Sequence, residues 1–250
     1  MCVSTHLYLY TPMKIALLGY GKMGREIEKI AVGRQHEMVL RIDVDNLMEF
    51  TTENLQKADV AIDFSTPASA VANIMKCFEA GVPIVCGTTG WIDKLEEIKQ
   101  ECTKSNGTFF YASNFSIGVN IFFAVNRYLA SLMTKVQGYE PILKEIHHIH
   151  KLDEPSGTAI TLANELIEKY PRKKGWELNT EGDEGKLGIT AVREGEVPGT
   201  HIINWDSEVD RIEITHEAKS RKGFAIGAVL AAEFIKDKKG VFSMNDVLNL

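Results

Sequence analysis

Residues 145–159, with the sequence EIHHIHKLDEPSGTA, concentrate side chains that can exchange protons or carry charge. They hold three of the seven histidines of the chain, and Lys151 follows these histidines directly. If the chain is extended through Lys151, successive side chains point to opposite faces. His147 and Lys151 then share one face, and His148 and His150 point the other way. A histidine and a lysine would therefore project together from one surface.

The residues Pro155-Ser156-Gly157-Thr158 are typical of the start of a helix. The first N–H groups of a helix have no partner inside it, so a helix start can hold a carboxylate. Proton donors, a cation and a helix start this close together predict a site in which an anionic substrate receives a proton.

Two other interpretations of the histidines stay open. His148 and His150, two residues apart on one strand face, could chelate a metal ion. The HxHxDH-type pattern of hydrolytic zinc sites is absent, however, and no cysteine lies close in the sequence. One histidine, with His150 as the first candidate, could instead be structural and satisfied by hydrogen bonds. We expect no bound metal.

A glycine-rich turn near the start of the sequence predicts a nucleotide site. Gly19, Gly21 and Gly24 have the spacing GxGxxG, follow an apolar run at residues 14–18 and precede a helical pattern. Such glycines allow a tight turn and a close approach of backbone N–H groups to a pyrophosphate. An ordinary strand–helix turn is the alternative.

Asp43 ends the next predicted strand, 19 residues after Gly24. A carboxylate at this place can accept hydrogen bonds from the adenosine ribose, and it disfavours a 2′-phosphate. We therefore expect NADH as the preferred cofactor and NADPH as the second choice. Two nearby cations, Arg34 and Arg41, weaken that preference.

Strands and helices alternate through residues 14–112, which predicts a parallel sheet with helices on both faces. We expect strands at residues 14–18, 37–43, 58–65, 82–86 and 108–112, and helices at 25–32, 66–81 and 91–104. The loops Gly87-Thr88-Thr89-Gly90 and Ala112-Ser113-Asn114-Phe115-Ser116 end the fourth and fifth strands. Ligands bind at such strand ends.

The pattern changes after residue 118. We expect an apolar helix over 119–133, an extended segment over 139–152, a helix over 157–170 and a loop over 171–187. Three alternating stretches at 188–194, 200–206 and 209–216 predict antiparallel pairing, and a helix over 224–236 precedes the tail. The chain is thus predicted to be an α/β protein, with a Rossmann-type dinucleotide-binding domain and a second, α+β domain.

Composition narrows the class of protein. The 250 residues carry a formal net charge of −6, and no cluster of Lys and Arg indicates a surface for nucleic acid. No apolar run approaches the ~20 residues that span a bilayer. The four cysteines form no CxxC pair, which favours reduced thiols and a cytoplasmic location. The first residues lack the features of a signal peptide, so we expect either that Met13 is the natural start or that residues 1–12 form a loosely held extension.

From about Met13 to Leu250 the chain resembles the dihydrodipicolinate reductase family. The most specific part is residues 145–159, which are close to the family signature E-x-H-H-x-x-K-x-D-x-P-S-G-T-A. The loops at 87–90 and 112–120 and the stretch ITHEAKSR at 214–221 support the resemblance. Lys22 departs from it, since many members have arginine there.

The resemblance implies the reduction of 4-hydroxy-tetrahydrodipicolinate, a cyclic imine dicarboxylate, in lysine and diaminopimelate biosynthesis. It makes His147 the general acid/base and Lys151 a second donor that offsets substrate charge. His148 would lie against the substrate, and the helix start at Ser156, Gly157 and Thr158 would bind a carboxylate. The residues expected at the cofactor are Gly19, Tyr20, Gly21, Lys22, Met23, Gly24, Asp43, Gly87, Thr88, Thr89, Ala112, Ser113, Asn114 and Phe115.

The resemblance also implies a domain organisation. Residues 13–117 and 222–250 would form the nucleotide domain. Residues 118–221 would form a substrate-binding domain whose open, mixed sheet assembles a homotetramer. Two alternatives stay open: a Rossmann-type reductase of another small anionic imine or carbonyl compound, and a nicotinamide-sensing regulatory module, although no DNA-binding element is recognisable. We expect neither a nucleic-acid nor a membrane partner.

Overall fold

The computed structural model describes residues 11–250, so the expectation about residues 1–12 falls almost entirely outside the described residues. The chain divides into two compact units. The first runs to Phe115 and resumes with Phe224–Asn249, and the second comprises Ser116–Gly223 and the last residue. No helix within residues 11–250 is both long and apolar enough to cross a membrane.

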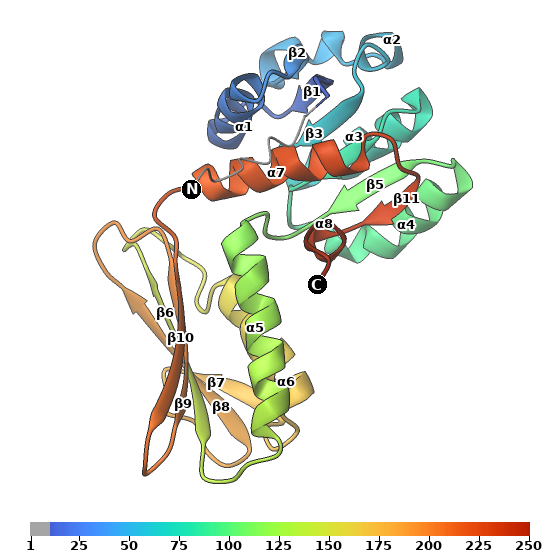
Figure 1. Cartoon of the computed structure of the whole chain (residues 1–250). Coiled ribbons are helices and arrows are strands. Elements are labelled where there is room, and N and C mark those ends of the chain that lie inside the picture. Colours follow the sequence, from blue (N-terminus) through green and yellow to red (C-terminus); the bar gives the residue numbers. More distant parts are fainter. Residues whose placement is uncertain (1–10) are drawn as a thin grey trace, which may run out of the picture. The chain divides into compact units, whose positions relative to one another are not determined.

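The first unit is built on a six-stranded sheet in the order β11-β5-β4-β3-β1-β2, in which every pair is parallel (Figure 1). Its central strands are short apolar runs that are fully buried, as expected for a sheet covered on both faces. The strands are β1 (Lys14–Leu18), β2 (Glu37–Ile42), β3 (Val60–Asp63), β4 (Ile84–Cys86), β5 (Thr108–Tyr111) and β11 (Gly240–Phe242). The predicted Rossmann-type parallel sheet is confirmed.

Helices alternate with these strands along the chain. Local signals fix several of their ends: Pro67 opens α3 behind the capping residue Thr66, and Gly81 closes it in the left-handed conformation. The helices are α1 (Lys22–Gly33), α2 (Thr52–Leu55), α3 (Pro67–Ala80), α4 (Leu95–Lys104), α7 (Lys222–Ile235) and α8 (Met244–Leu248), with 3-10 turns η1 (Val44–Glu49) and η2 (Ile92–Lys94).

The second unit packs two helices against one face of a five-stranded mixed sheet in the order β10-β9-β6-β8-β7 (Figure 1). Its core joins the helices to Leu143, Ile189, Ile203 and Trp205 of the sheet. The elements are α5 (Ile117–Met133), β6 (Glu140–His147), α6 (Gly157–Lys169), β7 (Gly175–Leu178), β8 (Lys186–Arg193), β9 (Thr200–Asp206) and β10 (Arg211–Glu217). The predicted α+β unit with a mixed sheet is confirmed.

Three details of the sequence interpretation are wrong. Residues 171–187 are not all loop, because β7 lies among them and pairs with β8. Of the three stretches expected to pair antiparallel, only β9 and β10 do so, since β6 lies between β8 and β9 and pairs parallel with β8. The tail holds a further strand, β11, which completes the first sheet beside β5. The pairings of β6 with β8 and of β11 with β5 join segments distant in sequence, which no local pattern reveals.

The extended segment expected over residues 139–152 also ends early. Strand β6 stops at His147, and a turn follows in which the Lys151 N–H donates to the His148 carbonyl at 3.1 Å. The Ile149 N–H donates to the Gly195 carbonyl instead of continuing the ladder. The face alternation therefore holds as far as His147 and fails at Lys151.

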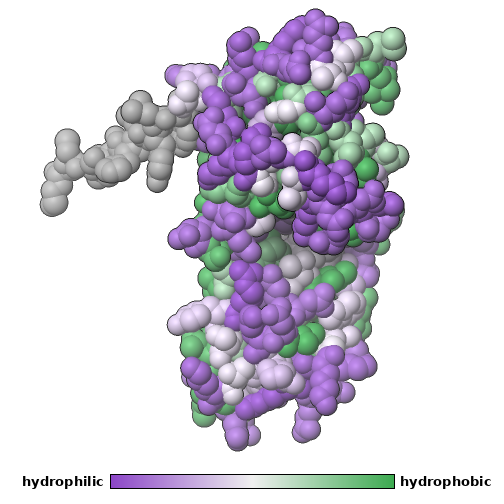
Figure 2. All heavy atoms as spheres, turned by 90° about the vertical axis from the view of Figure 1, so that its right-hand side faces the viewer, coloured by the Kyte–Doolittle hydropathy of each residue, from purple (hydrophilic) through white to green (hydrophobic). Residues whose placement is uncertain are grey.

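The surface shows no large apolar area on the face seen in Figure 2, where hydrophilic and hydrophobic residues are interspersed. Scattered apolar residues of this kind are normal on a protein surface.

Candidate active site

Strand register in the second unit gathers four polar residues on the helix-facing side of the sheet. Glu145 and His147 alternate with the core residue Leu143 on β6, the middle strand of three. The Cα partner of His147 is Arg193 on β8, and the partner of Glu145 is His201 on β9. The order of the strands thus assembles a cluster from segments about fifty residues apart.

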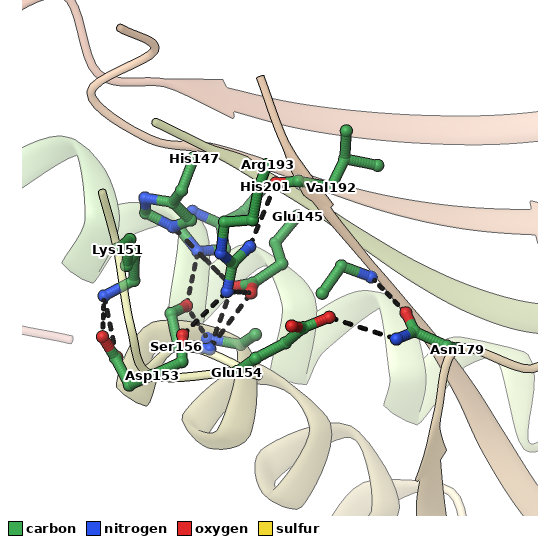
Figure 3. Close-up of polar contacts among 12 residues, drawn as sticks. Glu145, His147, Lys151, Asp153, Glu154, Ser156, Asn179, Val192, Arg193 and His201 are labelled. Carbon is green, nitrogen blue, oxygen red and sulfur yellow. Dashed lines mark hydrogen bonds and ion pairs between the residues drawn. The ribbon is translucent and has the colours of Figure 1, made fainter. Parts of the chain in front are cut away.

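Glu145 is the fixed centre of this cluster. Its side chain is 0% exposed, and Oε1 lies 3.0 Å from Nη2 of Arg193. The backbone N–H of Ser156 donates to both carboxylate oxygens, at 3.2 and 3.1 Å (Figure 3). A buried carboxylate is stable only with such partners. Glu145 therefore ties the start of α6 to the sheet beside His147.

The ring of His147 is buried within this cluster. The backbone of Pro198 lies close enough to the ring to raise the pKa of His147 in part. Nε2 is buried and has no hydrogen-bond partner among residues 11–250, although Oε2 of Glu145 lies 3.7 Å away. Nε2 is therefore a ring nitrogen that is left to exchange a proton.

Neighbouring groups shift the pKa of His147 in opposite directions. Burial lowers the pKa of His147, the Glu145 carboxylate raises it in part, and Lys151 and Arg193 lower it further. The ring is therefore mostly neutral near pH 7. Negative charge arriving beside it would raise its pKa and favour its protonated, acidic form.

His201 supports the same cluster from β9. Its Nε2 lies 3.1 Å from Oγ of Ser156, and its ring packs edge-on against His147 with centroids 5.2 Å apart. Burial lowers the pKa of His201 to about 3, so this ring is neutral. It is a packing and hydrogen-bonding partner for His147 and for the helix start.

Lys151 follows the turn and remains near the cluster. Its side chain is 20% exposed, and Nζ lies 2.7 Å from both carboxylate oxygens of Asp153. The charge of Lys151 is close enough to lower the pKa of His147. Alternation on a strand predicted that His147 and Lys151 lie close together, and in the structure the turn brings them close instead.

The other two histidines behave differently. His148 is half-buried, and its Nδ1 has no hydrogen-bond partner among the described residues. His150 is exposed, with Nε2 3.3 Å from Oε1 of Glu196. The tilted rings of His148 and His150 have centroids 6.1 Å apart.

The start of α6 is organised by Ser156. Its Oγ accepts from the Ala159 N–H at 3.2 Å, so Ser156 is the helix cap, and it is buried. The N–H and hydroxyl of Ser156 are both used inside the protein. Gly157 is exposed and Thr158 is half-buried, so the first turn of the helix is open on their side.

One possible metal centre overlaps this cluster. Glu145, His147 and His201 each place a ligand atom within 4.8 Å of the others, the one such group found in residues 11–250. The Glu145 carboxylate, however, already has Arg193 and the Ser156 N–H as partners. These donors supply the positive charge that a cation would bring. The residues fit a proton-exchanging site better than a metal centre.

In the first unit, the turn between β1 and α1 fits a pyrophosphate. A Cβ on Gly19 would come within 2.3 Å of the Phe64 carbonyl, and one on Gly24 within 2.2 Å of the Gly19 carbonyl. These two glycines are required by close packing. A Cβ on Gly21 would meet nothing within 4 Å, so the helix start is open at that point. Tyr20 lies in this turn, and Lys22 and Met23 are the first residues of α1.

The other residues expected at the cofactor follow neighbouring strands at the same edge of the sheet. Asp43 follows β2, residues 87–89 follow β4, and residues 112–115 follow β5. Asp43 also caps η1, with Oδ1 accepting from the Val44 N–H at 2.9 Å. Carboxyl ends of adjacent parallel strands meet at one edge, so these groups line one side of the unit.

Two of these residues have structural tasks. The hydroxyl of Thr88 donates to the buried carboxylate of Asp63 at 3.0 Å and accepts from the Ser65 N–H at 2.9 Å, which anchors the 87–90 loop. The ring of Phe115 is buried against Phe64, with centroids 5.5 Å apart. Only the backbone of Phe115 is available to a ligand.

Sequence reasoning missed Arg193, His201 and Asp63 as parts of the sites. A signal for one of them exists: His201 is a polar residue on a strand face that is otherwise apolar, next to Ile203. A polar residue in a buried alternation needs a partner. That partner cannot be identified before the strand order is known.

Comparison with known proteins covers nearly the whole chain. The model of the N-terminus of dihydrodipicolinate reductase matches residues 13–115, and the model of its C-terminus matches residues 118–248. A 4-hydroxy-tetrahydrodipicolinate reductase from Christiangramia forsetii is 52% identical over 237 residues, which cover 95% of this chain and 98% of that protein. The enzyme of that name from Archaeoglobus fulgidus is 36% identical, with 94% of this chain and 100% of that protein covered.

A solved structure supports the fold. Dipicolinate-bound dihydrodipicolinate reductase from Paenisporosarcina sp. TG-14 is similar with a TM-score of 0.76 and 24% identity, over 94% of this chain and 99% of that one.

Proposed function

Because the chain belongs to the dihydrodipicolinate reductase family, we propose that it reduces 4-hydroxy-tetrahydrodipicolinate to tetrahydrodipicolinate with a nicotinamide dinucleotide, in lysine and diaminopimelate biosynthesis. The observation that carries this proposal is the buried, unpartnered Nε2 of His147 beside the cation Lys151 and the start of α6. This arrangement suits a dianionic imine that must take up a proton.

The reaction divides the work between the cofactor and the protein. When bound, the reduced nicotinamide supplies a hydride to the substrate ring. Loss of the 4-hydroxyl as water, together with a hydrogen of the neighbouring ring carbon, makes the ring imine conjugated. Addition of the hydride to this conjugated imine leaves enamine character, and the neighbouring ring carbon then takes up a proton. We assign that proton to Nε2 of His147, since this buried nitrogen has no hydrogen-bond partner among the described residues.

The two carboxylates of the substrate need positive partners. We propose that Lys151 offsets one negative charge and serves as a second proton donor, and that the open first turn of α6, at Gly157 and Thr158, holds a carboxylate. His148 would lie against the substrate. Ser156 would contribute indirectly: its hydroxyl caps the helix and its N–H bonds to Glu145, so the hydroxyl would not contact the substrate.

We further propose that residues 13–117 and 222–250 bind the nucleotide and that residues 118–221 bind the substrate. The glycine turn at 19–24 would receive the pyrophosphate, and Asp43 the adenosine ribose. The loops at 87–89 and 112–115 lie at the same sheet edge and would contact the rest of the cofactor.

We propose NADH as the preferred cofactor. From the sequence alone, Arg34 and Arg41 weaken this preference, because either cation could bind a 2′-phosphate. In the structure both are ion-paired: Nε of Arg34 lies 2.7 Å from Oε1 of Glu233, and Nε of Arg41 lies 2.9 Å from Oε1 of Glu28. Replacing Asp43 by alanine should move the ratio of kcat/KM towards NADPH. A wild-type preference for NADPH above about tenfold, ~1.4 kcal/mol, would contradict the assignment.

We also propose a cytoplasmic homotetramer. The face of the second sheet opposite the helices carries the partly buried apolar residues Ile142, Ile146 and Ile202, and a second copy could cover it. Sedimentation at several concentrations would test this, and a monomer at micromolar concentration would contradict it.

The activity itself is tested by mixing the purified protein with 4-hydroxy-tetrahydrodipicolinate and NADH or NADPH. We expect oxidation of the nucleotide and formation of tetrahydrodipicolinate, identified by mass spectrometry. If the nucleotides bind but this substrate causes no oxidation, the alternative gains support, namely a reductase of another small anionic imine or carbonyl compound.

A further inference from the structure

A chain of polar contacts links the glycine turn to the second strand of the nucleotide unit. The hydroxyl of Tyr20, in the turn, donates to Oε2 of Glu28 on α1. The guanidinium of Arg41, on β2, donates to Oε1 of the same carboxylate through Nε at 2.9 Å and through Nη2. Nη1 of Arg41 donates to the Met38 carbonyl at 3.3 Å. Both oxygens of Glu28 and all three nitrogens of Arg41 are therefore engaged.

The location of Arg41 makes this pairing consequential. Arg41 lies two residues before Asp43, whose extended backbone continues the alternation of β2, so the two side chains leave on the same side. Their Cα atoms are about 7 Å apart along the strand, a distance that an extended arginine side chain covers. A released Arg41 could thus reach a phosphate on the ribose held by Asp43. Its side chain is 42% exposed, and its hydrogen bonds to Glu28 and to the Met38 carbonyl hold it in place.

Glu28 is suited to hold this cation. Its side chain is 19% exposed, and the hydrogen bond from Arg41 lowers the pKa of Glu28, which keeps the carboxylate ionised at neutral pH. Nε and Nη2 of Arg41 both donate to Oε1 of Glu28, and hydrogen bonds between charged groups are roughly twice as strong as those between neutral groups.

We propose that Glu28 is a specificity-determining residue of the cofactor site: by binding Arg41 it withholds that cation from a 2′-phosphate and so favours NADH over NADPH. The inference rests on the proposed function, because it assumes that the glycine turn and Asp43 receive the nucleotide. It adds a residue that touches neither nucleotide directly.

Calorimetric titration of the full-length protein with NADH and with NADPH tests the proposal without turnover. Glu28→Gln keeps the size of the side chain and removes the charge that holds Arg41. We expect the ratio of the two dissociation constants to shift towards NADPH by on the order of tenfold, the ~1.4 kcal/mol of one charge-assisted bond. Glu28→Asp, which keeps the charge but shortens the reach, should shift the ratio in the same direction by less.

Two further variants separate release of Arg41 from simple loss of negative charge. Arg41→Met alone should leave the ratio unchanged, since the arginine is not available in the wild type, whereas Glu28→Gln with Arg41→Met should cancel the gain. Glu233→Gln is the matched control: it removes the carboxylate that pairs with Arg34 at the opposite end of α1 and should not change the ratio. Another cation, Arg25, lies with its guanidinium 5.7 Å from the centre of the Tyr20 ring, and it is left unchanged in every variant.

The outcomes are distinct. An unchanged ratio in both Glu28 variants overturns the proposal, as does a gain that persists in the double variant. Equal gains from Glu233→Gln and Glu28→Gln overturn it as well. A wild type that binds neither nucleotide overturns the proposed function and this inference with it, whereas failure of the inference alone leaves nucleotide binding and turnover intact.

Discussion

Replacing His147 by glutamine removes the proposed proton donor while preserving its place in the fold. Glutamine has a similar size, and its amide can still form hydrogen bonds. The amide cannot deliver a proton as an acid at neutral pH. General acid–base assistance contributes ~10²–10⁴-fold to rate. We expect the lower part of this range, because Lys151 lies close enough to act as a second donor.

The predicted effect is a fall in kcat of at least ~10²-fold, ~2.7 kcal/mol in activation free energy. The dissociation constant for NADH should change little, since the glycine turn belongs to the other unit. Steady-state turnover of the substrate and calorimetric titration of the nucleotide measure the two quantities separately.

His150→Gln is the matched control for this variant. His150 is exposed, and its ion-pair partner Glu196 is also on the surface. Its replacement should therefore lower kcat much less than replacement of His147. If His150→Gln proves the more damaging change, or if EDTA inactivates the wild type, the proton-donor assignment fails and a metal site in this segment becomes the better explanation.

Three further predictions follow from the geometry. Gly21→Val should abolish nucleotide binding with little loss of stability, since a Cβ at Gly21 meets no protein atom within 4 Å; NADH affinity equal to that of the wild type would refute it. Lys151→Ala should raise KM and lower kcat by removing a positive charge from a dianion site, and a change confined to nucleotide affinity would speak against this role. Burial lowers the pKa of His201 to about 3 from 6.5, so the unfolded chain binds a proton between these values that the folded chain does not. The free energy of unfolding should therefore decrease as the pH is lowered below about 6.5. His201 should account for roughly 2.5 kcal/mol of this decrease between about pH 7 and about pH 4.5. Urea unfolding of His201→Gln at both pH values should show a smaller difference than the wild type, and an equal difference would contradict the reasoning.

The nucleotide unit was largely predictable because its signals are local. Each central strand is a short buried run, Gly81 stops a helix, and the GxGxxG spacing marks the turn after β1. The strand β11 was not predictable. It has three residues and depends on its pairing with β5, more than a hundred positions earlier in the chain.

The candidate active site was predictable only in part. The sequence placed His147 and Glu145 on one strand face, which the structure has, because alternation is a local property of β6. The positions of Arg193 and His201 depend on β6 lying between β8 and β9, and this order has no local signal. The place of Lys151 depends on a turn that forms because the Ile149 N–H bonds to the Gly195 carbonyl, a contact across 46 residues that alternation could not anticipate.

The most direct test of the account follows the hydride. The protein would be given 4-hydroxy-tetrahydrodipicolinate and NADH carrying deuterium at the transferred position of C4, and the product would be examined by mass spectrometry. We predict tetrahydrodipicolinate that carries one deuterium from the nucleotide, with its other new hydrogen taken from the solvent. Nucleotide oxidation that leaves the product unlabelled, or no product at all with a bound nucleotide, would contradict the proposed reduction.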